Sequence, residues 1–498
     1  MRLKEDICAL ATGFLHADTI VESYILRSSY RMTNHNIALL IPVENQVREL
    51  DAKILLACIA ARRGLQAIIG LKRDVESRIA SFQRSIYLSK SLLHGHRKFI
   101  RIARKLGHEI AAWDEDALVH LPPDIYFSRR LSPVTLGYVS HLFAWGPDNA
   151  DLWRQYPELP EGLQIHITGN PRGDLLRPEI RKFYQRKVEE LKRAHGDFIL
   201  INTNFNHVNA FTPNRNLFQP ADKNDEQPKF GRAARGMTRE YAEGLHDHKK
   251  AIFEHFQNMI PILEKAFPDN IIIVRPHQVE DQNVYHRIAA RCERVRVTNQ
   301  GYVVPWIMAA KVLIHNGCTT SVEAAALNVP AISFRAIQND YYDFGFYRLP
   351  NMLSHQCLNI EELQNVLKEI LSGKRGVADG DERDMIIDRH LTAQKGPLAC
   401  ERIIDVIEKT MRSLSKSSRP PLRDLMGGWY KATKRRLRHH QRLKGKGSQQ
   451  SLKYQHHKNP GITPLEVNAR IERFQQIMGN EEKLRVNRIY DRLYHISA

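Results

Sequence analysis

Two kinds of apolar pattern alternate along the chain from about residue 36 onward. The run IALLIPV (37–43) is continuously apolar, as expected of a parallel strand covered on both faces. The next residues, 49–63, carry apolar side chains at helical spacing, and Gly64 precedes a second short apolar run, LQAIIGL (65–71). This order of strand, helix, glycine and strand predicts a βαβ unit.

The alternation fills two blocks of similar size. In the first block, HLFAWG (141–146) and LQIHITG (163–169) add strands before a charged helix at 179–194. In the second block, FILINTNF (198–205) is a strand, and residues 295–334 follow the order strand, short helix, strand, helix, strand. Two such blocks predict two doubly wound sheets that face one cleft.

The remaining segments set the expected boundaries. The polar stretch 212–236 predicts a mobile loop, and the spacing of apolar residues over 464–494 predicts a C-terminal helical hairpin. The expected organisation is an N-terminal extension (1–35), an N-terminal Rossmann-like domain (36–195), a C-terminal Rossmann-like domain (196–410), a basic linker (411–460) and C-terminal helices (461–498).

Positive charge is concentrated near the C-terminus. The chain carries a net charge of +19, and residues 411–460 hold fourteen lysines and arginines against one acid, Asp424. The two blocks are therefore nearly balanced, whereas a nucleic-acid-binding domain usually spreads a basic face over its fold. The basic segment predicts an interaction tail for anionic lipid or for RNA, and we expect no specific nucleic-acid partner.

Cysteine usage and hydropathy indicate a compartment. The six cysteines are scattered without a CxxC pair, which argues against a disulfide framework and a structural zinc site. The N-terminus has acids at Glu5 and Asp6 and makes a poor signal peptide. Because no stretch of about 18 apolar residues occurs, we expect a cytoplasmic protein that associates peripherally with the inner face of the plasma membrane.

The segment IHNGCTTSVE (314–323) has the strongest pattern for ligand binding. A strand ends there, Asn316 and Gly317 form a turn, and hydroxyl residues open a helix. Strand ends and helix N-termini in such sheets bind phosphate, so we expect donor phosphates here and Glu323 near a ribose. The predicted phosphate contacts from the helix start are Thr319, Thr320 and Ser321. The alternative is an ordinary capped helix.

Two further strand ends of the second block carry candidate groups. Arg275 and His277 follow the strand IIIV, where Arg offers a fork for phosphate oxygens and His can protonate a leaving group. The alternative is that both are simply solvated. Asn204, after the first strand of this block, is a predicted donor contact or part of a buried polar turn.

The first block supplies candidates for the acceptor side. Glu44 follows the first strand and is the predicted base for an acceptor hydroxyl, or an electrostatic partner to it. The alternative is that Glu44 caps the next helix and Arg48 pairs with an acid. Asp114 and Glu115, in the strand-end sequence WDED, are rival bases.

The turn NPR after the last strand of the first block places two more polar groups near the cleft. Asn170 and Arg172 either frame the cleft or belong only to the domain hinge. Several classes are excluded by absent motifs: the chain has no P-loop, no GxGxxG after a strand, no GxSxG and no HExxH.

Several of these segments together resemble the bacterial surface carbohydrate biosynthesis protein family. The resemblance runs from about residue 36 to about 407 through IPVENQVRELD, WDEDALV, ITGNPRGDLLRPE, ILINTNFNHVN, RPHQ and HNGCTTSVEAAALNVPAISF. More distantly, the second block resembles capsule Kdo transferases, CDP-glycerol glycerophosphotransferases and UDP-GlcNAc 2-epimerases. Capsule Kdo transferases tend to show a His-Pro pair, whereas the order here is Pro276-His277.

The resemblance implies an α/β, GT-B-like fold: two Rossmann-like domains facing a cleft, here with a basic helical C-terminal extension. It also implies a nucleotide-sugar donor held by the second domain and no metal or other cofactor. The expected function is a glycosyltransferase-like enzyme that acts on a lipid- or polymer-linked glycan acceptor in capsule, O-antigen or lipopolysaccharide synthesis. A 2-epimerase-like enzyme, a CDP-alcohol phosphotransferase, and a non-catalytic RNA-binding or scaffold protein remain the alternatives.

Overall fold

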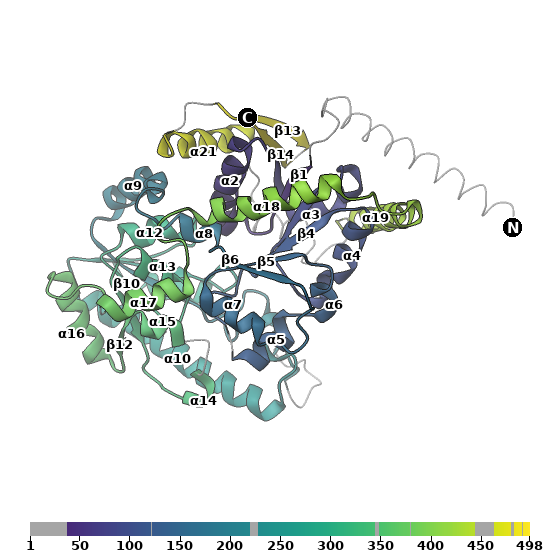
Figure 1. Cartoon of the computed structure of the whole chain (residues 1–498). Helices are drawn as coiled ribbons and strands as arrows, with labels where there is room; N and C mark the ends of the chain where they lie inside the picture. Colours follow the sequence, from purple (N-terminus) through teal and green to yellow (C-terminus); the bar gives the residue numbers. More distant parts are fainter. Residues whose placement is uncertain are drawn as a thin grey trace.

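The protein is built on two separate β-sheets, each flanked by helices (Figure 1). The computed structural model describes residues 37–120, 122–219, 228–343, 348–378, 380–443, 463–479, 483–490 and 492–498. The predicted extension 1–35 and the last part of the predicted linker, residues 444–460, lie outside these ranges. In the described part, two α/β domains follow one another along the chain, so the predicted GT-B-like architecture is confirmed.

The first sheet has eight strands in the order β13-β14-β2-β1-β3-β4-β5-β6. Its parallel strands are β1 (Ala38–Val43), β2 (Gln66–Leu71), β3 (Ile86–Ser89), β4 (Glu109–Ala112), β5 (His141–Ala144) and β6 (Gln164–Ile167). The α-helices between and after them are α2 (Gln46–Arg62), α3 (Lys72–Ser77), α4 (Arg97–Lys105), α5 (Pro123–Arg130), α6 (Pro133–Leu136), α7 (Pro147–Arg154) and α8 (Pro171–Asp174).

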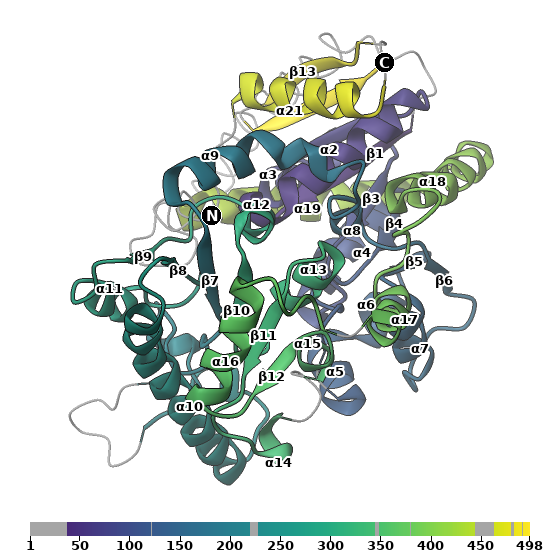
Figure 2. The same ribbon diagram turned by 90° about the vertical axis from the view of Figure 1, so that its left-hand side faces the viewer.

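The second sheet has six parallel strands in the order β12-β11-β10-β7-β8-β9 (Figure 2). They are β7 (Phe198–Thr203), β8 (Ile271–Pro276), β9 (Val295–Val297), β10 (Val312–His315), β11 (Ala331–Phe334) and β12 (His355–Cys357). The α-helices are α9 (Gln185–His195), α10 (Arg239–Ala266), α11 (Asn283–Ala289), α12 (Val303–Ala309), α13 (Thr320–Ala326), α14 (Asp340–Asp343), α15 (Arg348–Met352), α16 (Ile360–Leu371) and α17 (Gly380–His390).

Local sequence explains the first βαβ unit. All six residues of β1 are buried, as its continuous apolar run requires of a strand covered on both faces. The Asn45 side chain accepts a hydrogen bond from the Arg48 amide and caps α2. Gly64, at φ +76°, turns the chain toward β2. The N-cap is therefore Asn45, and the alternative that Glu44 caps this helix is wrong.

After the second sheet the chain crosses back to the first domain (Figure 1). Helix α18 (Ala399–Lys416) packs on α2 and α8, and the Asp174 carboxylate accepts the amides of Ala399 and Cys400 at 2.8 and 2.9 Å. This carboxylate caps the helix start. Helix α18 thus lies on the first domain, although the predicted boundary at 410 grouped most of it with the second. Helix α19 (Leu422–Leu443) follows it there and packs on α4 and α3.

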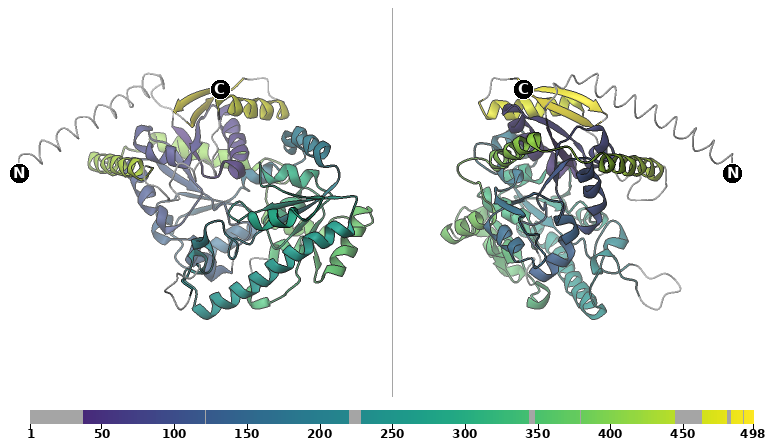
Figure 3. Two further views of the ribbon diagram at one scale, coloured as in Figure 1. Left: turned by 180° about the vertical axis from the view of Figure 1, so that it is seen from behind. Right: turned by 45° about the vertical axis from the view of Figure 1, so that its right-hand side comes forward.

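The predicted C-terminal helical hairpin is half wrong. Helix α21 (Pro464–Ile477) forms, but the remaining residues make a β-hairpin of β13 (Arg485–Tyr490) and β14 (Leu493–Ser497) (Figure 3). Strand β14 pairs antiparallel with β2 and so covers the edge of the first sheet. Three side chains of β14 that are at most 2% exposed show why pairing prevails over helical spacing: Leu493, Tyr494 and Ile496.

The polar segment after β7 is only partly described. Residues 212–219 and 228–236 contain two short 3-10 turns and an antiparallel bridge between Phe218 and Phe230. Residues 220–227 lie outside the described part, so the predicted motion of this loop stays a prediction.

Candidate functional site

Loops at the carboxyl ends of strands from both sheets meet between the two domains. Asn45, after β1, donates from Nδ2 to Oε1 of Gln278, after β8, at 2.9 Å. Arg172, after β6, donates from Nη2 to Oε1 of Glu323, in α13, at 2.7 Å. Ligands of open parallel sheets bind at these strand ends. The two domains therefore present their ligand-binding edges to each other.

The Arg172–Glu323 ion pair is buried at this junction. The two residues are 5% and 3% exposed, and Glu115 lies 3.8 Å from Arg172. Burial lowers the pKa of the Arg172 guanidinium, but Tyr302, Glu323 and Glu115 together hold it above its ordinary value. Arg172 thus joins the domains, as its hinge and cleft alternatives both allow. The carboxylate of Glu323 already accepts a hydrogen bond from Arg172. The ribose contact predicted for Glu323 stays a prediction.

Glu44 lies beside two lysines from neighbouring strand ends. Its Oε2 is 3.1 Å from Nζ of Lys72, after β2, and 3.5 Å from Nζ of Lys90, after β3. Partial burial raises the pKa of Glu44, but Lys90 and Lys72 outweigh this and lower it to about 2. A carboxylate this acidic is a weak proton acceptor at neutral pH. The geometry favours the electrostatic alternative for Glu44 over the predicted role as base.

The other acidic candidates of the first domain are also engaged. Asp114 accepts from the Tyr126 hydroxyl at 2.9 Å and from Nε of Arg130 at 3.0 Å. Glu115 accepts from Nε1 of its neighbour Trp113 at 2.6 Å. Both are nearly fully buried, so they fix the loop after β4, and their role as bases stays a prediction.

Arg48 and Asn170 each have a local partner as well. Arg48 pairs with Asp116 at 2.9 Å, which matches the alternative that it pairs with an acid. Oδ1 of Asn170 accepts from the Arg172 amide at 3.0 Å and caps α8. Nδ2 of Asn170 is buried and has no partner among the described residues. Asn170 therefore positions Arg172 and keeps one donor unused.

The turn after β10 is held by side chains from the sheet. Oδ1 of Asn316 accepts from the Asn204 amide at 2.9 Å and ties β10 to β7. Gly317, at φ +83°, occupies a conformation that favours glycine, and its amide donates to Nδ1 of His315 at 3.0 Å. Burial lowers the pKa of His315 to about 3, so its ring is neutral and can accept this bond. Its Nε2 lies 2.8 Å from Oγ of Ser354.

The start of α13 satisfies its own hydroxyl groups. Ser321 is fully buried and donates to the Cys318 carbonyl at 2.8 Å, and Thr320 donates to Cys318 Sγ at 3.1 Å. Thr319 is half-buried. For Thr320 and Ser321 this is the arrangement of an ordinary helix start, so the phosphate contacts predicted for the three hydroxyl residues stay predictions.

Three residues at and just after the end of β7 have buried side-chain atoms without partners among the described residues. Among the described residues, no hydrogen bond reaches Oδ1 or Nδ2 of Asn202, Oδ1 of Asn204 or Nδ1 of His207. Burial lowers the pKa of His207 to about 3, with Lys249 and Arg129 acting in the same direction. A buried polar atom left unpaired costs about 1–3 kcal/mol, so such a group indicates a missing partner. The sequence placed both asparagines in the polar strand end NTNFNHVN (202–209) and singled out Asn204, but it assigned no role to His207.

Arg275 and His277 differ in their surroundings. The guanidinium of Arg275 donates to the carbonyls of Gln300 and Gly301, both at 3.0 Å, and lies over the Trp306 ring. Burial lowers its pKa to about 9. It thus supports the loop before Tyr302. His277 is exposed. The phosphate and leaving-group roles of this pair stay predictions.

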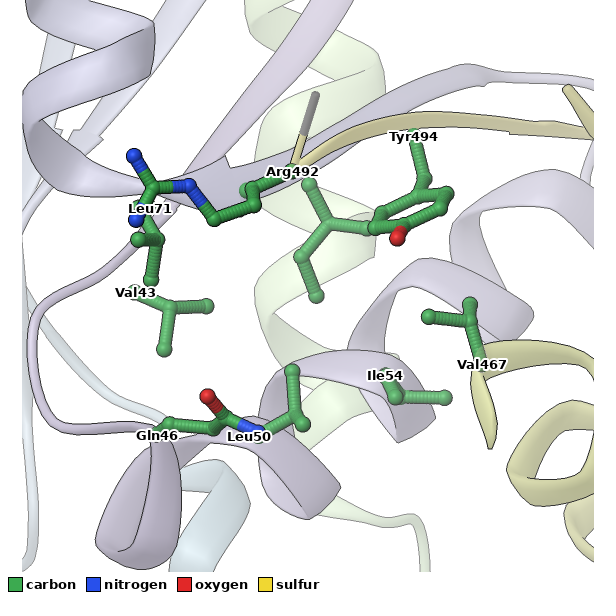
Figure 4. A pocket seen from close by; sticks show the side chains of 10 residues that line it. Val43, Gln46, Leu50, Ile54, Leu71, Val467, Arg492 and Tyr494 are labelled. Carbon is green, nitrogen blue, oxygen red and sulfur yellow. The ribbon is translucent and has the colours of Figure 1, made fainter. Parts of the chain in front are cut away.

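A separate small pocket lies between α2, the first sheet and the C-terminal elements α21 and β14 (Figure 4). Its walls are mainly aliphatic and come from α2, β1, β2, α21 and β14, with Gln46 and Arg492 as the polar lining residues. None of the site residues predicted from the sequence lines it. The pocket is therefore distinct from the strand-end residues that meet between the two domains.

Comparison with known proteins gives similarities of architecture. No family model matches this chain. No curated protein matches it either. Among solved structures, a variant of the wall teichoic acid polymerase TagF soaked with CDPG has a TM-score of 0.48 at 12% identity, covering 82% of this chain and 99% of that one.

Sugar-nucleotide epimerases show a similar level of likeness. UDP-GlcNAc 2-epimerase from Methanocaldococcus jannaschii, in complex with UDP-GlcNAc and UDP, has a TM-score of 0.46 at 12% identity, with 75% and 100% of the two chains covered. UDP-N-acetylglucosamine 2-epimerase from Rickettsia bellii has a TM-score of 0.43 at 12% identity and covers 77% and 98%. Similarities of this size do not fix the activity of this chain.

Proposed function

We propose that this protein is a GT-B-type glycosyltransferase-like enzyme that transfers a sugar from a nucleotide-activated donor to a lipid- or polymer-linked acceptor in surface polysaccharide synthesis. The observation that carries the proposal is the group of unpartnered buried atoms on Asn202, Asn204 and His207. They lie at the end of β7, next to the strand that ends in the Gly317 turn. A nucleotide donor has hydroxyl groups that could donate to the two asparagine oxygens, and phosphate oxygens that could accept from Nδ2 of Asn202.

The two domains have different roles in this proposal. The second domain holds the donor at the ends of β7 and β10, with Oδ1 of Asn204 facing a hydroxyl group of the donor and the Gly317 turn closest to its phosphates. The first domain presents Glu44, Lys72 and Lys90 to the acceptor. Transfer breaks the bond between the anomeric carbon and the phosphate oxygen and forms one to the acceptor oxygen, and the proton of the acceptor hydroxyl passes to the departing phosphate. Positioned dipoles and cations stabilise the departing phosphate, and no metal cofactor is assigned.

A thermal-shift screen tests donor binding. CMP, CDP, UDP, GDP and their sugar conjugates are added to the full chain, and a ligand at 100 times its Kd should stabilise the protein by about 2.7 kcal/mol. Asn204→Ala should abolish the shift. Asn270→Ala is the matched control and should leave the shift intact. Asn270 lies just before β8, at the amino ends of the strands of the same sheet and so away from the proposed donor site.

The products then decide the chemistry. Extension of a glycan acceptor supports the proposal, whereas release of a free epimerised sugar or transfer of an alcohol phosphate would replace it with one of the two related chemistries. A panel in which no nucleotide shifts the wild-type melting temperature would contradict donor binding altogether. Attachment of the basic segment to an anionic membrane is part of this proposal, since lipid-linked acceptors lie there.

A further inference from the structure

Helix α19 presents an apolar stripe on its outer side. The stripe consists of five large side chains that are between 37% and 72% exposed: Leu422, Met426, Trp429, Tyr430 and Leu437. At 3.6 residues per turn these positions span only about 100° of the helix surface. The described part of the chain has no helix long and apolar enough to cross a membrane. The stripe therefore belongs to a helix that lies on the protein surface.

The opposite side of α19 is fixed to the first domain. Ala432 is buried, and Gly428 faces Leu106 so closely that a Cβ would stand 3.1 Å from its Cγ. Arg435 reaches the buried carboxylate of Glu76 at 2.5 Å, and Asp424 pairs with Lys105. These contacts set the rotation of the helix. The exposed stripe is thus held outward by the fold.

Basic residues border the stripe on one side. Exposed Arg423, Lys431, Lys434 and Arg438 occupy the surface between the stripe and the docked face. The whole helix has seven lysines and arginines and one acid, Asp424. Trp and Tyr beside Lys and Arg on one helix face are typical of helices that lie in the interface of an anionic membrane.

We propose that α19 is a membrane-docking helix that inserts Leu422, Met426, Trp429, Tyr430 and Leu437 among the headgroups of an anionic phospholipid surface. The complementary charge of the flanking basic residues selects this occupant. Because the helix is fixed to the first domain, docking would also orient that domain, which holds the residues proposed to face the acceptor substrate. The docking assigns the membrane attachment of the proposed function to one helix, and it does not depend on donor binding or on transfer; the orientation step rests on the proposed function.

The native tryptophans provide a direct assay. The chain has five tryptophans, and Trp113, Trp145, Trp153 and Trp306 are at most 6% exposed, whereas Trp429 is 37% exposed. Full-length protein is mixed with vesicles of phosphatidylcholine alone or with phosphatidylglycerol, carrying brominated acyl chains. We expect binding to the anionic vesicles and quenching of one tryptophan, which Trp429→Phe removes.

Two variants with the same charge change separate the stripe from general attraction. Met426→Asp with Tyr430→Asp should weaken vesicle binding by on the order of tenfold or more. Met385→Asp with Leu465→Asp also replaces two exposed apolar side chains, which are 67% and 80% exposed on other helices, and should bind as wild type. Unchanged melting temperatures show that both variants fold.

Three results would overturn the docking proposal: equal weakening by both double variants, vesicle binding without tryptophan quenching, or binding to an RNA oligomer but not to vesicles. The nucleotide shift in solution is a separate readout. Loss of docking with an intact nucleotide shift would refute membrane attachment and leave donor binding standing, whereas docking without a nucleotide shift would refute donor binding and leave membrane attachment standing.

Discussion

Replacing Arg172 by methionine should uncouple the two domains. The substitution removes a guanidinium that is 5% exposed and pairs with Glu323 at 2.7 Å. Glu323 and Glu115, each 3% exposed, would then lack this cation. Breaking a buried pair by removing one partner costs about 3–5 kcal/mol, because the remaining charge stays out of water. We expect Arg172→Met to lower the free energy of unfolding by this amount.

A double-mutant cycle measures the coupling by urea unfolding. Glu323→Gln removes the charge on the other side, and the double variant should recover about 0.5–3 kcal/mol relative to the sum of the single changes. The exposed pair of Arg154 and Asp151, with side chains 51% and 46% exposed, supplies the control. Arg154→Met should cost less than about 1 kcal/mol. Additive effects at Arg172 and Glu323 would refute the claim that this pair couples the domains.

Three further predictions follow from local environments. Glu44→Gln should lower the free energy of unfolding at pH 7. Because the pKa of Glu44 is lowered from 4.5 to about 2, the stability difference between wild type and variant should vanish as the pH falls from 4.5 to 2. A difference that persists at pH 2 would contradict the pairing with Lys72 and Lys90. Burial lowers the pKa of His315 from 6.5 to about 3, so below pH 6.5 the unfolded chain takes up a proton that the folded protein does not. Wild-type stability should therefore fall as the pH drops below 6.5, and His315→Gln should reduce this dependence in melting curves recorded at different pH values. Gly70→Ala would bring a Cβ within 2.4 Å of the Arg492 carbonyl; it should destabilise by about 1–3 kcal/mol and expose the C-terminal hairpin to limited proteolysis, and unchanged protection would contradict the tight approach of β14.

The sheets could be predicted because burial on both faces leaves a direct pattern. The run at β1 is continuously apolar, β7 begins with the apolar run FILI and β10 with VLI, and the structure buries every residue of the three strands. The C-terminal hairpin could not be found in this way. Leu484, Ile489 and Leu493 fit a helical period, but β2 offers an open edge, and pairing with that edge decides the conformation.

The site was predictable in position but not in its pairings. Strand ends identified Glu44, Asn204 and Arg172, because parallel strands place their carboxyl ends along one edge. Local sequence does not reveal that Arg172 meets Glu323, 151 residues away. Lys72 and Lys90 were missed, although Lys72 is the first residue after β2 and Lys90 the first residue after β3, and both strands end beside Glu44. Treating every strand end as one set would have found these two lysines.

The most direct test of the account is a crystal structure of the protein with the nucleotide that gives the largest thermal shift. We predict that the nucleotide lies between the domains, with hydrogen bonds to the unpartnered atoms of Asn202, Asn204 or His207 and with its phosphates near the Gly317 turn. A nucleotide bound elsewhere, such as in the pocket beside Arg492, with those atoms still unpaired, would contradict the account.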